Sequence, residues 1–136
     1  LTIAEDSGLV VDALDGEPGV RSARFLRPDA SYAERFEAIY TRLAENPERP
    51  RSARFVCALA AARGTGVVFE TTGTIEGEIS AEPRGASGFG YDPIFFYPPY
   101  GRTLAEVTDE EKLLVAHRGH AFRRLRDWLD AAATSS

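Results

Sequence analysis

Residues 69–79 read FETTGTIEGEI, and this stretch decides the fold prediction. Every even position carries Thr or Glu, whereas the odd positions carry mainly Phe, Ile and Gly. A period of two over this length predicts a long β-strand with one face in water. Glycines inside a strand weaken it, so Gly73 and Gly77 predict a bend or a bulge.

The neighbouring segments turn this strand into a sheet. Residues 54–62 read as a largely buried strand, and Gly64-Thr65-Gly66 is a turn that joins the two strands. A half-solvated, hairpin-linked strand favours a mixed β-sheet flanked by helices over an all-parallel sheet. We therefore predict an α/β fold. No repeat or linker divides the chain, so residues 1–136 are expected to form one domain.

Helix signals flank these strands. Ser31 and Glu34 have capping-box spacing before a helical pattern that runs to Asn46-Pro47. Further capping boxes at 103–106 and 108–111 each predict a short helix. A final amphipathic helix, which frays into residues 134–136, is predicted from the apolar face formed by Ala121, Leu125, Trp128, Leu129 and Ala132.

Composition excludes several classes of protein. The net charge is −5, and residues 1–20 hold five carboxylates and no Lys or Arg. Such a chain is a poor partner for nucleic acid, whereas a dense acidic segment suits a hard cation or is simply a solvated loop. The apolar run at 55–62 is too short to span a bilayer, so no membrane association is expected. A lone Cys57 fits a reducing, cytoplasmic setting.

Three stretches carry side chains suited to chemistry. Glu5-Asp6 lies between the apolar segments 1–4 and 9–14, at an expected break beside a strand, where one carboxylate suits Mg²⁺ and the other a water. Residues 85–93 combine three glycines with Phe89 and Tyr91, two aromatic faces on which a planar base can stack, and with Asp92, an acceptor. Taken alone, the first stretch is more simply interpreted as an ordinary acidic turn, and an aromatic-glycine bend that caps the core is an equally reasonable interpretation of the second.

Lys112 and His117-Arg118 form the third stretch, near the start of the last helix. An ammonium, an imidazole and a guanidinium within a few residues can neutralise phosphates and donate to the oxygens of a base. A structural histidine is the alternative. The spacing of His and Cys does not fit a zinc site.

Together these motifs resemble the inosine triphosphate pyrophosphatase family, whose members are also called XTP/dITP diphosphatases. The motifs that carry the resemblance are EDSGL at 5–9, PGVRSARF at 18–25, GFGYDPIF at 88–95, and Lys112 with His-Arg-Gly at 117–119. The resemblance covers the whole chain and implies hydrolysis of ITP, dITP or XTP to the monophosphate and pyrophosphate, with Mg²⁺, in a homodimer.

The resemblance also implies roles for individual residues. Asp6 would be the proton acceptor that activates water, and Glu5 and Asp6 would belong to the metal site. Substrate would be bound by Ser7, by Phe89, Gly90, Tyr91 and Asp92 around the purine, and by Lys112, His117 and Arg118 at the phosphates and the 6-keto base. Donors matched to a 6-keto oxygen would be left unpaired by adenine, which costs about 1–3 kcal/mol per donor.

Two departures from the family stand out. Ala116 replaces the usual Ser before His-Arg, which removes one hydroxyl contact. Members of the family also begin with a strand and a phosphate-binding loop that nothing before Leu1 supplies, so the chain resembles the C-terminal two-thirds of the enzyme. The alternatives are therefore a truncated member that serves as a nucleotide-binding or dimerisation module without catalysis, and a structural domain with coincidental motifs.

Overall fold

A computed structural model describes residues 1–134. Five strands form one sheet in the order β1 (Thr2–Val11), β2 (Ser52–Arg63), β3 (Gly66–Ile79), β4 (Phe95–Tyr97) and β5 (Arg102–Thr103), and each neighbouring pair is antiparallel. The helices are α1 (Tyr32–Glu45), α2 (Asp109–Val115) and α3 (His117–Thr134). Short 3₁₀ turns occupy Asp12–Leu14, Gly19–Arg24, Asp92–Ile94 and Pro98–Tyr100. The predicted α/β fold with a sheet and flanking helices is thus confirmed, whereas the parallel pairing of a mixed sheet is not found among the strands of residues 1–134.

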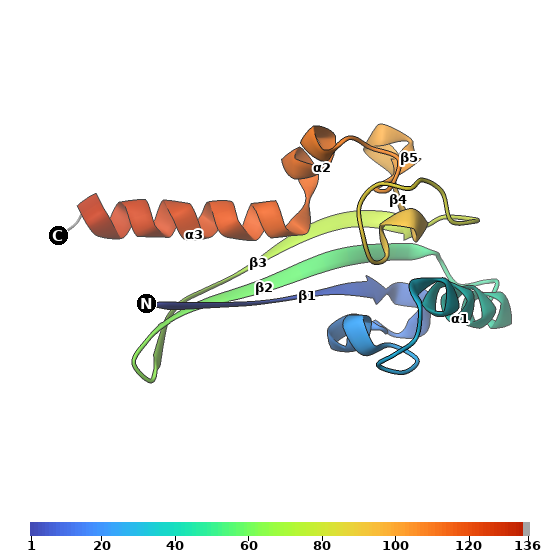
Figure 1. The fold of residues 1–136 in the computed structure, drawn as a ribbon, viewed down its shortest axis with the longest axis horizontal. Coiled ribbons are helices and arrows are strands. Elements are labelled where there is room, and N and C mark those ends of the chain that lie inside the picture. The colour runs from blue at the N-terminus through green and yellow to red at the C-terminus, as the bar shows by residue number, and fades with distance from the viewer. Residues whose placement is uncertain (135–136) are drawn as a thin grey trace.

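The first three strands form a long, curved antiparallel ribbon, with α3 lying along one end and α1 near the other (Figure 1). The odd-numbered residues of β2 point to one face, where Ala53, Phe55, Cys57, Leu59 and Ala61 are all buried. Alternate side chains of a strand face opposite sides, so this face carries the core and the other carries exposed Thr and Glu. The alternation in residues 69–79 therefore predicted β3 correctly.

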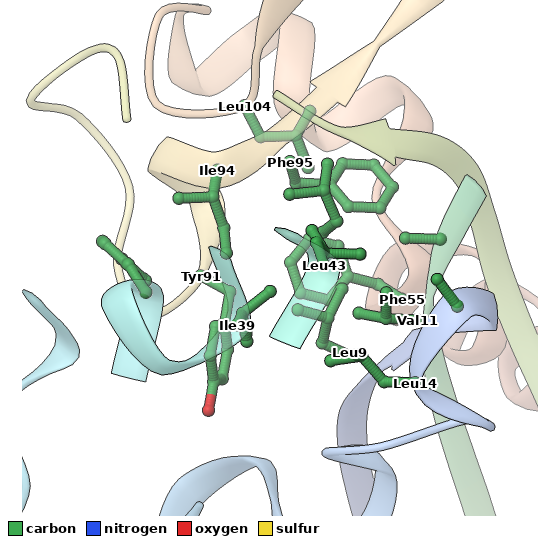
Figure 2. Packing of buried hydrophobic residues seen from close by; sticks show 14 of the residues in the cluster. Leu9, Val11, Leu14, Ile39, Leu43, Phe55, Tyr91, Ile94, Phe95 and Leu104 are labelled. Atoms are coloured by element: carbon green, nitrogen blue, oxygen red, sulfur yellow. The ribbon is translucent and has the colours of Figure 1, made fainter. Parts of the chain in front are cut away.

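Two core clusters share that face of the sheet. The larger cluster joins Leu9 and Phe55 of the sheet to Ile39 and Leu43 of α1 and to Phe95 (Figure 2). The smaller cluster packs Cys57, Leu59 and Ala61 against Ala121 and Leu125 of α3. The apolar face predicted for the last helix is confirmed at Ala121 and Leu125, whereas Leu129 is 38% exposed. Fraying was predicted for residues 134–136, but α3 still includes Thr134, and residues 135 and 136 lie outside the described residues.

Capping explains where two helices begin. The Ser31 hydroxyl accepts from the backbone N–H of Glu34, and the Glu34 carboxylate accepts from the backbone N–H of Ser31, as the spacing predicted. Thr108 and Glu111 form the same reciprocal pair at the start of α2. At Thr103 the prediction was wrong: its N–H donates to the Glu106 carboxylate, but β5 ends there and a turn follows, not a helix.

The predicted break at residues 5–8 was also wrong, because β1 pairs with β2 without interruption from Thr2 to Val11. Gly8 is used for close packing: a Cβ at this position would lie 2.3 Å from the Gly19 carbonyl oxygen. The register shift between β2 and β3 lies at Ala61/Ala62 and not at Gly73 or Gly77. Among the described helices, none has the length and apolar character that crossing a bilayer requires.

Candidate functional site

A cavity of about 420 Å³ lies on the core face of the sheet, bounded by the larger core cluster and the first turn of α3. Every residue predicted to bind substrate contributes to its wall: Ser7, Phe89, Gly90, Tyr91, Asp92, Lys112, His117 and Arg118. These residues come from β1, the loop before β4, α2 and α3. The fold therefore brings together four segments that are far apart in the sequence.

The first turn of α3 reaches the cavity because Gly73 gives it room. A Cβ at position 73 would lie 2.2 Å from the His117 carbonyl oxygen and 2.7 Å from the Ala121 backbone nitrogen. The His117 ring in turn stacks on Phe55 at 5.1 Å between ring centroids, with an 18° angle between the rings. The strand and the helix start thus hold the imidazole against the sheet.

Sequence reasoning missed several residues of the wall. Tyr32 from α1, Phe55 from β2 and Leu113 from α2 line the cavity, as do Leu9, Ala23 and Asp109. In the sequence, Phe55 belongs to an apolar run, and Tyr32 belongs to the helical pattern that follows Ser31. Their spacing gave no signal of a ligand site, because the walls of apolar pockets are built from ordinary core residues.

Asp92 organises the loop that carries Phe89. Its side chain is 7% exposed, and its Oδ2 accepts from the Phe89 N–H at 3.0 Å and from the Lys112 ammonium at 2.5 Å. Lys112 Nζ also lies 4.5 Å from the centre of the Phe89 ring. Asp92 therefore fixes both the loop and the ammonium, in addition to lining the cavity.

We expect Lys112→Met to destabilise the protein by about 3 kcal/mol, because it leaves the buried Asp92 carboxylate without its cation. Denaturant unfolding would measure the loss. The double variant Lys112→Met/Asp92→Asn should recover most of the stability, since an amide at position 92 is neutral and still accepts from the Phe89 N–H. A double variant as unstable as the single variant would contradict this account.

The two aromatic residues beside Gly90 differ in role. Phe89 is 71% exposed, so its ring is available to a ligand. Tyr91 is 4% exposed, its ring packs edge-on to Tyr32, and its hydroxyl donates to the Ser22 carbonyl at 2.6 Å. The expectation that both rings offer a stacking face is therefore wrong for Tyr91, which belongs largely to the core.

His117 is neutral at physiological pH. Burial lowers the pKa of its imidazole to about 4, and the positive charges of Arg118 and Lys112 add to this effect. A neutral imidazole carries one N–H donor and one acceptor nitrogen. It can therefore donate to a carbonyl oxygen without adding a positive charge to the cavity.

This shift makes stability depend on pH. Because the folded pKa lies below the ordinary value of 6.5, the stabilisation is complete above pH 6.5 and is lost as pH falls towards 4. After allowance for partial solvent exposure, we expect a loss of about 2 kcal/mol. Unfolding free energies measured at several pH values should show a weaker decline in His117→Gln and an unchanged decline in His120→Gln. Equal pH profiles for the two variants would contradict the assignment.

Glu5 and Arg118 form a bidentate ion pair beside the cavity. The guanidinium Nη2 donates to Glu5 Oε1 at 2.6 Å, and Nε donates to Oε2 at 3.2 Å. Partial burial raises the pKa of Glu5, but the bonds from Arg118, Cys57 and Ser7 outweigh it, so the net pKa is below its usual value. Glu5 is therefore a charged partner of Arg118.

The predicted metal pair is not assembled. Glu5 and Asp6 are neighbours on a continuous strand, so their side chains leave opposite faces of the sheet. Glu5 faces Arg118 and Cys57, and neither carboxylate lines the cavity. Within residues 1–134, no three His, Cys, Asp or Glu side chains gather as metal ligands. Glu5 and Asp6 therefore do not form a two-carboxylate Mg²⁺ site in this structure.

Ala116 joins α2 to α3. Its N–H donates to the Lys112 carbonyl at 2.8 Å, and its carbonyl accepts from the His120 N–H at 3.2 Å. The residue thus ends one helix and begins the next, at the position where a Ser would offer a capping hydroxyl to the N-terminus of α3.

Fold and cavity together define an α/β protein with a partly apolar pocket that combines an exposed aromatic ring, a neutral imidazole and two ion pairs. The sequence model of the Ham1 family matches residues 1–128. The chain belongs to the Ham1 family, which confirms the resemblance inferred from its motifs.

Individual proteins to which the chain is similar are consistent with membership of this family. A dITP/XTP pyrophosphatase of Halalkalibacterium halodurans is 45% identical over 128 residues, which cover 94% of this chain and 66% of that protein. The structure of a HAM1 protein from Coxiella burnetii matches with a TM-score of 0.90 and 40% identity, over 95% of this chain and 66% of the other. A nucleoside-triphosphatase or dITP/XTP pyrophosphatase from Mycobacterium abscessus matches with a TM-score of 0.76 and 44% identity, over 90% and 65%. The chain thus spans about two-thirds of the length of these relatives.

Proposed function

We propose that this chain forms the base-binding part of a pyrophosphatase that hydrolyses ITP, dITP and XTP to the monophosphate and pyrophosphate. The observation that carries the proposal is the single cavity lined by all eight residues expected to bind the nucleotide. The names of relatives in the family agree with this substrate class. A homodimer and a requirement for Mg²⁺ are part of the proposal through the family resemblance alone.

The cavity offers a rationale for selecting 6-keto purines. The exposed Phe89 ring gives a base a stacking surface, and the neutral His117 offers one N–H to an oxygen at position 6. Adenine has an amino group there, so the donor would remain unpaired. Such a mismatch costs about 1–3 kcal/mol, which corresponds to roughly 5- to 150-fold discrimination.

Asp6 is proposed as the proton acceptor. A water oxygen would form a bond to a phosphorus of the anhydride between the α- and β-phosphates as the bond to the bridging oxygen breaks. The water proton would pass to the Asp6 carboxylate, and pyrophosphate would leave. Asp6 is exposed and adjacent in sequence to Ser7, which lines the cavity, but its side chain leaves the opposite face of the sheet, so its proposed role rests on the family resemblance.

A second candidate is a nucleotide-binding or dimerisation module without catalysis. The observation that favours it is the placement of Glu5 and Asp6 on opposite faces, with no cluster of metal ligands in the described part of the chain. A module of this kind would bind the base in the cavity but would not activate water.

Pyrophosphate release from ITP, XTP and dITP, with ATP and GTP as controls and with Mg²⁺ or EDTA, tests the proposal. Release from the first three nucleotides and not from ATP, lost in EDTA, is expected; guanine also carries an oxygen at position 6, so GTP tests whether the site discriminates at position 2 as well. Calorimetric binding of ITP without release would support the second candidate. If the chain shows no release of pyrophosphate and no binding of ITP, both candidate functions are overturned.

A further inference from the structure

Both oxygens of the Glu5 carboxylate are occupied by donors from this chain. Oε1 accepts from Arg118 Nη2 at 2.6 Å. Oε2 accepts from Arg118 Nε at 3.2 Å, from the Cys57 thiol at 3.2 Å and from the Ser7 hydroxyl at 3.4 Å. A carboxylate has about two lone-pair sites on each oxygen, so the three contacts occupy Oε2 fully and the guanidinium takes one of the two sites on Oε1.

Neighbouring residues hold the Glu5–Arg118 ion pair in place. Ser7 faces Cys57 across the β1–β2 pairing, and Cys57 is fully buried. Burial, and then the neighbouring carboxylate, raises the pKa of the Cys57 thiol, which keeps its proton on the sulfur that donates to Glu5. Arg118 is placed by the first turn of α3, which lies against Gly73 in the next strand.

Arg118 has N–H donors left for a ligand while Glu5 holds its guanidinium. A guanidinium has five N–H donors in a rigid planar fork, and Glu5 takes two of them. The remaining three are available at the wall of the cavity, to which Arg118 contributes. Fixing a long side chain before binding reduces the conformational entropy that is lost when a ligand binds.

We propose that Glu5 is the positioning residue of Arg118, holding its guanidinium at the cavity wall, and that it is not a ligand of a divalent cation. The part of this proposal that concerns nucleotides rests on the proposed function. The part that concerns the ion pair and the cation does not.

The first test needs no ligand. In ¹H–¹⁵N spectra of arginine side chains, the Arg118 Nε–H, assigned by its absence from Arg118→Lys, should give a resolved, slowly exchanging signal. Glu5→Ala should shift it to the position of freely solvated arginines, and Glu5→Gln should have an intermediate effect because its amide oxygen still accepts. Glu70→Ala is the matched control, since Glu70 lines the same open hollow as Glu5 but has no hydrogen bond to a described cation. An Arg118 signal unaffected by Glu5→Ala would overturn the proposal.

The second test uses Mn²⁺ alone and follows the broadening of backbone amide signals. Equal binding by the wild-type chain and Glu5→Ala, within about threefold and including no binding by either, is expected. Broadening around residues 5–7 that Glu5→Ala abolishes would identify Glu5 as a cation ligand and overturn the proposal. Glu5→Gln serves in the same titration if Glu5→Ala fails to fold.

The third test concerns nucleotides. In calorimetry, the preference for ITP over ATP should fall about tenfold in Glu5→Ala, a loss of the size expected for one charge-assisted hydrogen bond. Arg118→Ala should show a similar fall, and the double variant should show no further loss. Additive losses would contradict the positioning role. If the wild-type chain binds no ITP, the proposed function fails for this chain, and the first two tests still decide the role of Glu5.

Discussion

Asp6→Asn is expected to lower the rate of pyrophosphate release from ITP by at least 100-fold while leaving ITP affinity largely intact. The amide of Asn cannot accept a proton from water near neutral pH, whereas a carboxylate can. General-base catalysis contributes about 10²- to 10⁴-fold to the rate of a hydrolysis. Asp6 lies outside the cavity that holds the proposed base-binding residues, so binding of the base should not depend on it. The effect should therefore appear in kcat and not in KM.

Steady-state kinetics and calorimetry on Asp6→Asn would separate the effect on kcat from the effect on ITP affinity. Asp29→Asn is the control, because the Asp29 carboxylate is 86% exposed and pairs only with Arg27 among the salt bridges of residues 1–134. Turnover of Asp6→Asn within a few-fold of wild type would remove Asp6 from the proton-acceptor role. It would leave the assignment of the cavity unchanged.

Gly73→Ala is expected to destabilise the fold by about 1–3 kcal/mol, because the added methyl group would collide with backbone atoms of α3. The Cβ would lie 2.2 Å from the His117 carbonyl oxygen and 2.7 Å from the Ala121 nitrogen, and backbone atoms cannot move aside without shifting the helix. The same shift would displace His117 and Arg118 from the cavity wall. We therefore expect weaker ITP binding in addition to the loss of stability.

Denaturant unfolding would measure this loss, with Gly66→Ala as the control in the same strand. A Cβ at position 66 would meet nothing closer than the Arg63 carbonyl oxygen at 3.8 Å. Replacing Gly by Ala there should be neutral or stabilise the protein by up to about 1 kcal/mol. Equal stability of the two variants would show that α3 is not seated on Gly73.

Local patterns predicted the elements whose stability is decided locally. The capping boxes at Ser31 and Thr108 placed two helix starts, because each cap is a reciprocal bond between residues three apart. The alternation of residues 69–79 identified β3, because one of its faces is solvated over the whole length of the strand. The resemblance likewise identified eight of the residues that line the cavity.

Long-range contacts account for what the sequence could not show. The polar residues 5–8 suggested a break, but Glu5 is satisfied by Arg118, which lies 113 positions away, and the strand continues. Tyr91 looked like a stacking ring, yet its hydroxyl bonds to the Ser22 carbonyl 69 positions away and draws the ring into the core. Neither partner has a signature in the local sequence.

The cavity is bounded on one side by the larger core cluster and on another by the first turn of α3. A ligand that fills it would touch Phe55 and Tyr91 of that cluster as well as residues 117–119 of the helix. Occupancy would then raise the free energy of local opening for both parts together, by an amount set by ligand concentration and affinity. The backbone amides of both segments would then gain protection from hydrogen exchange together.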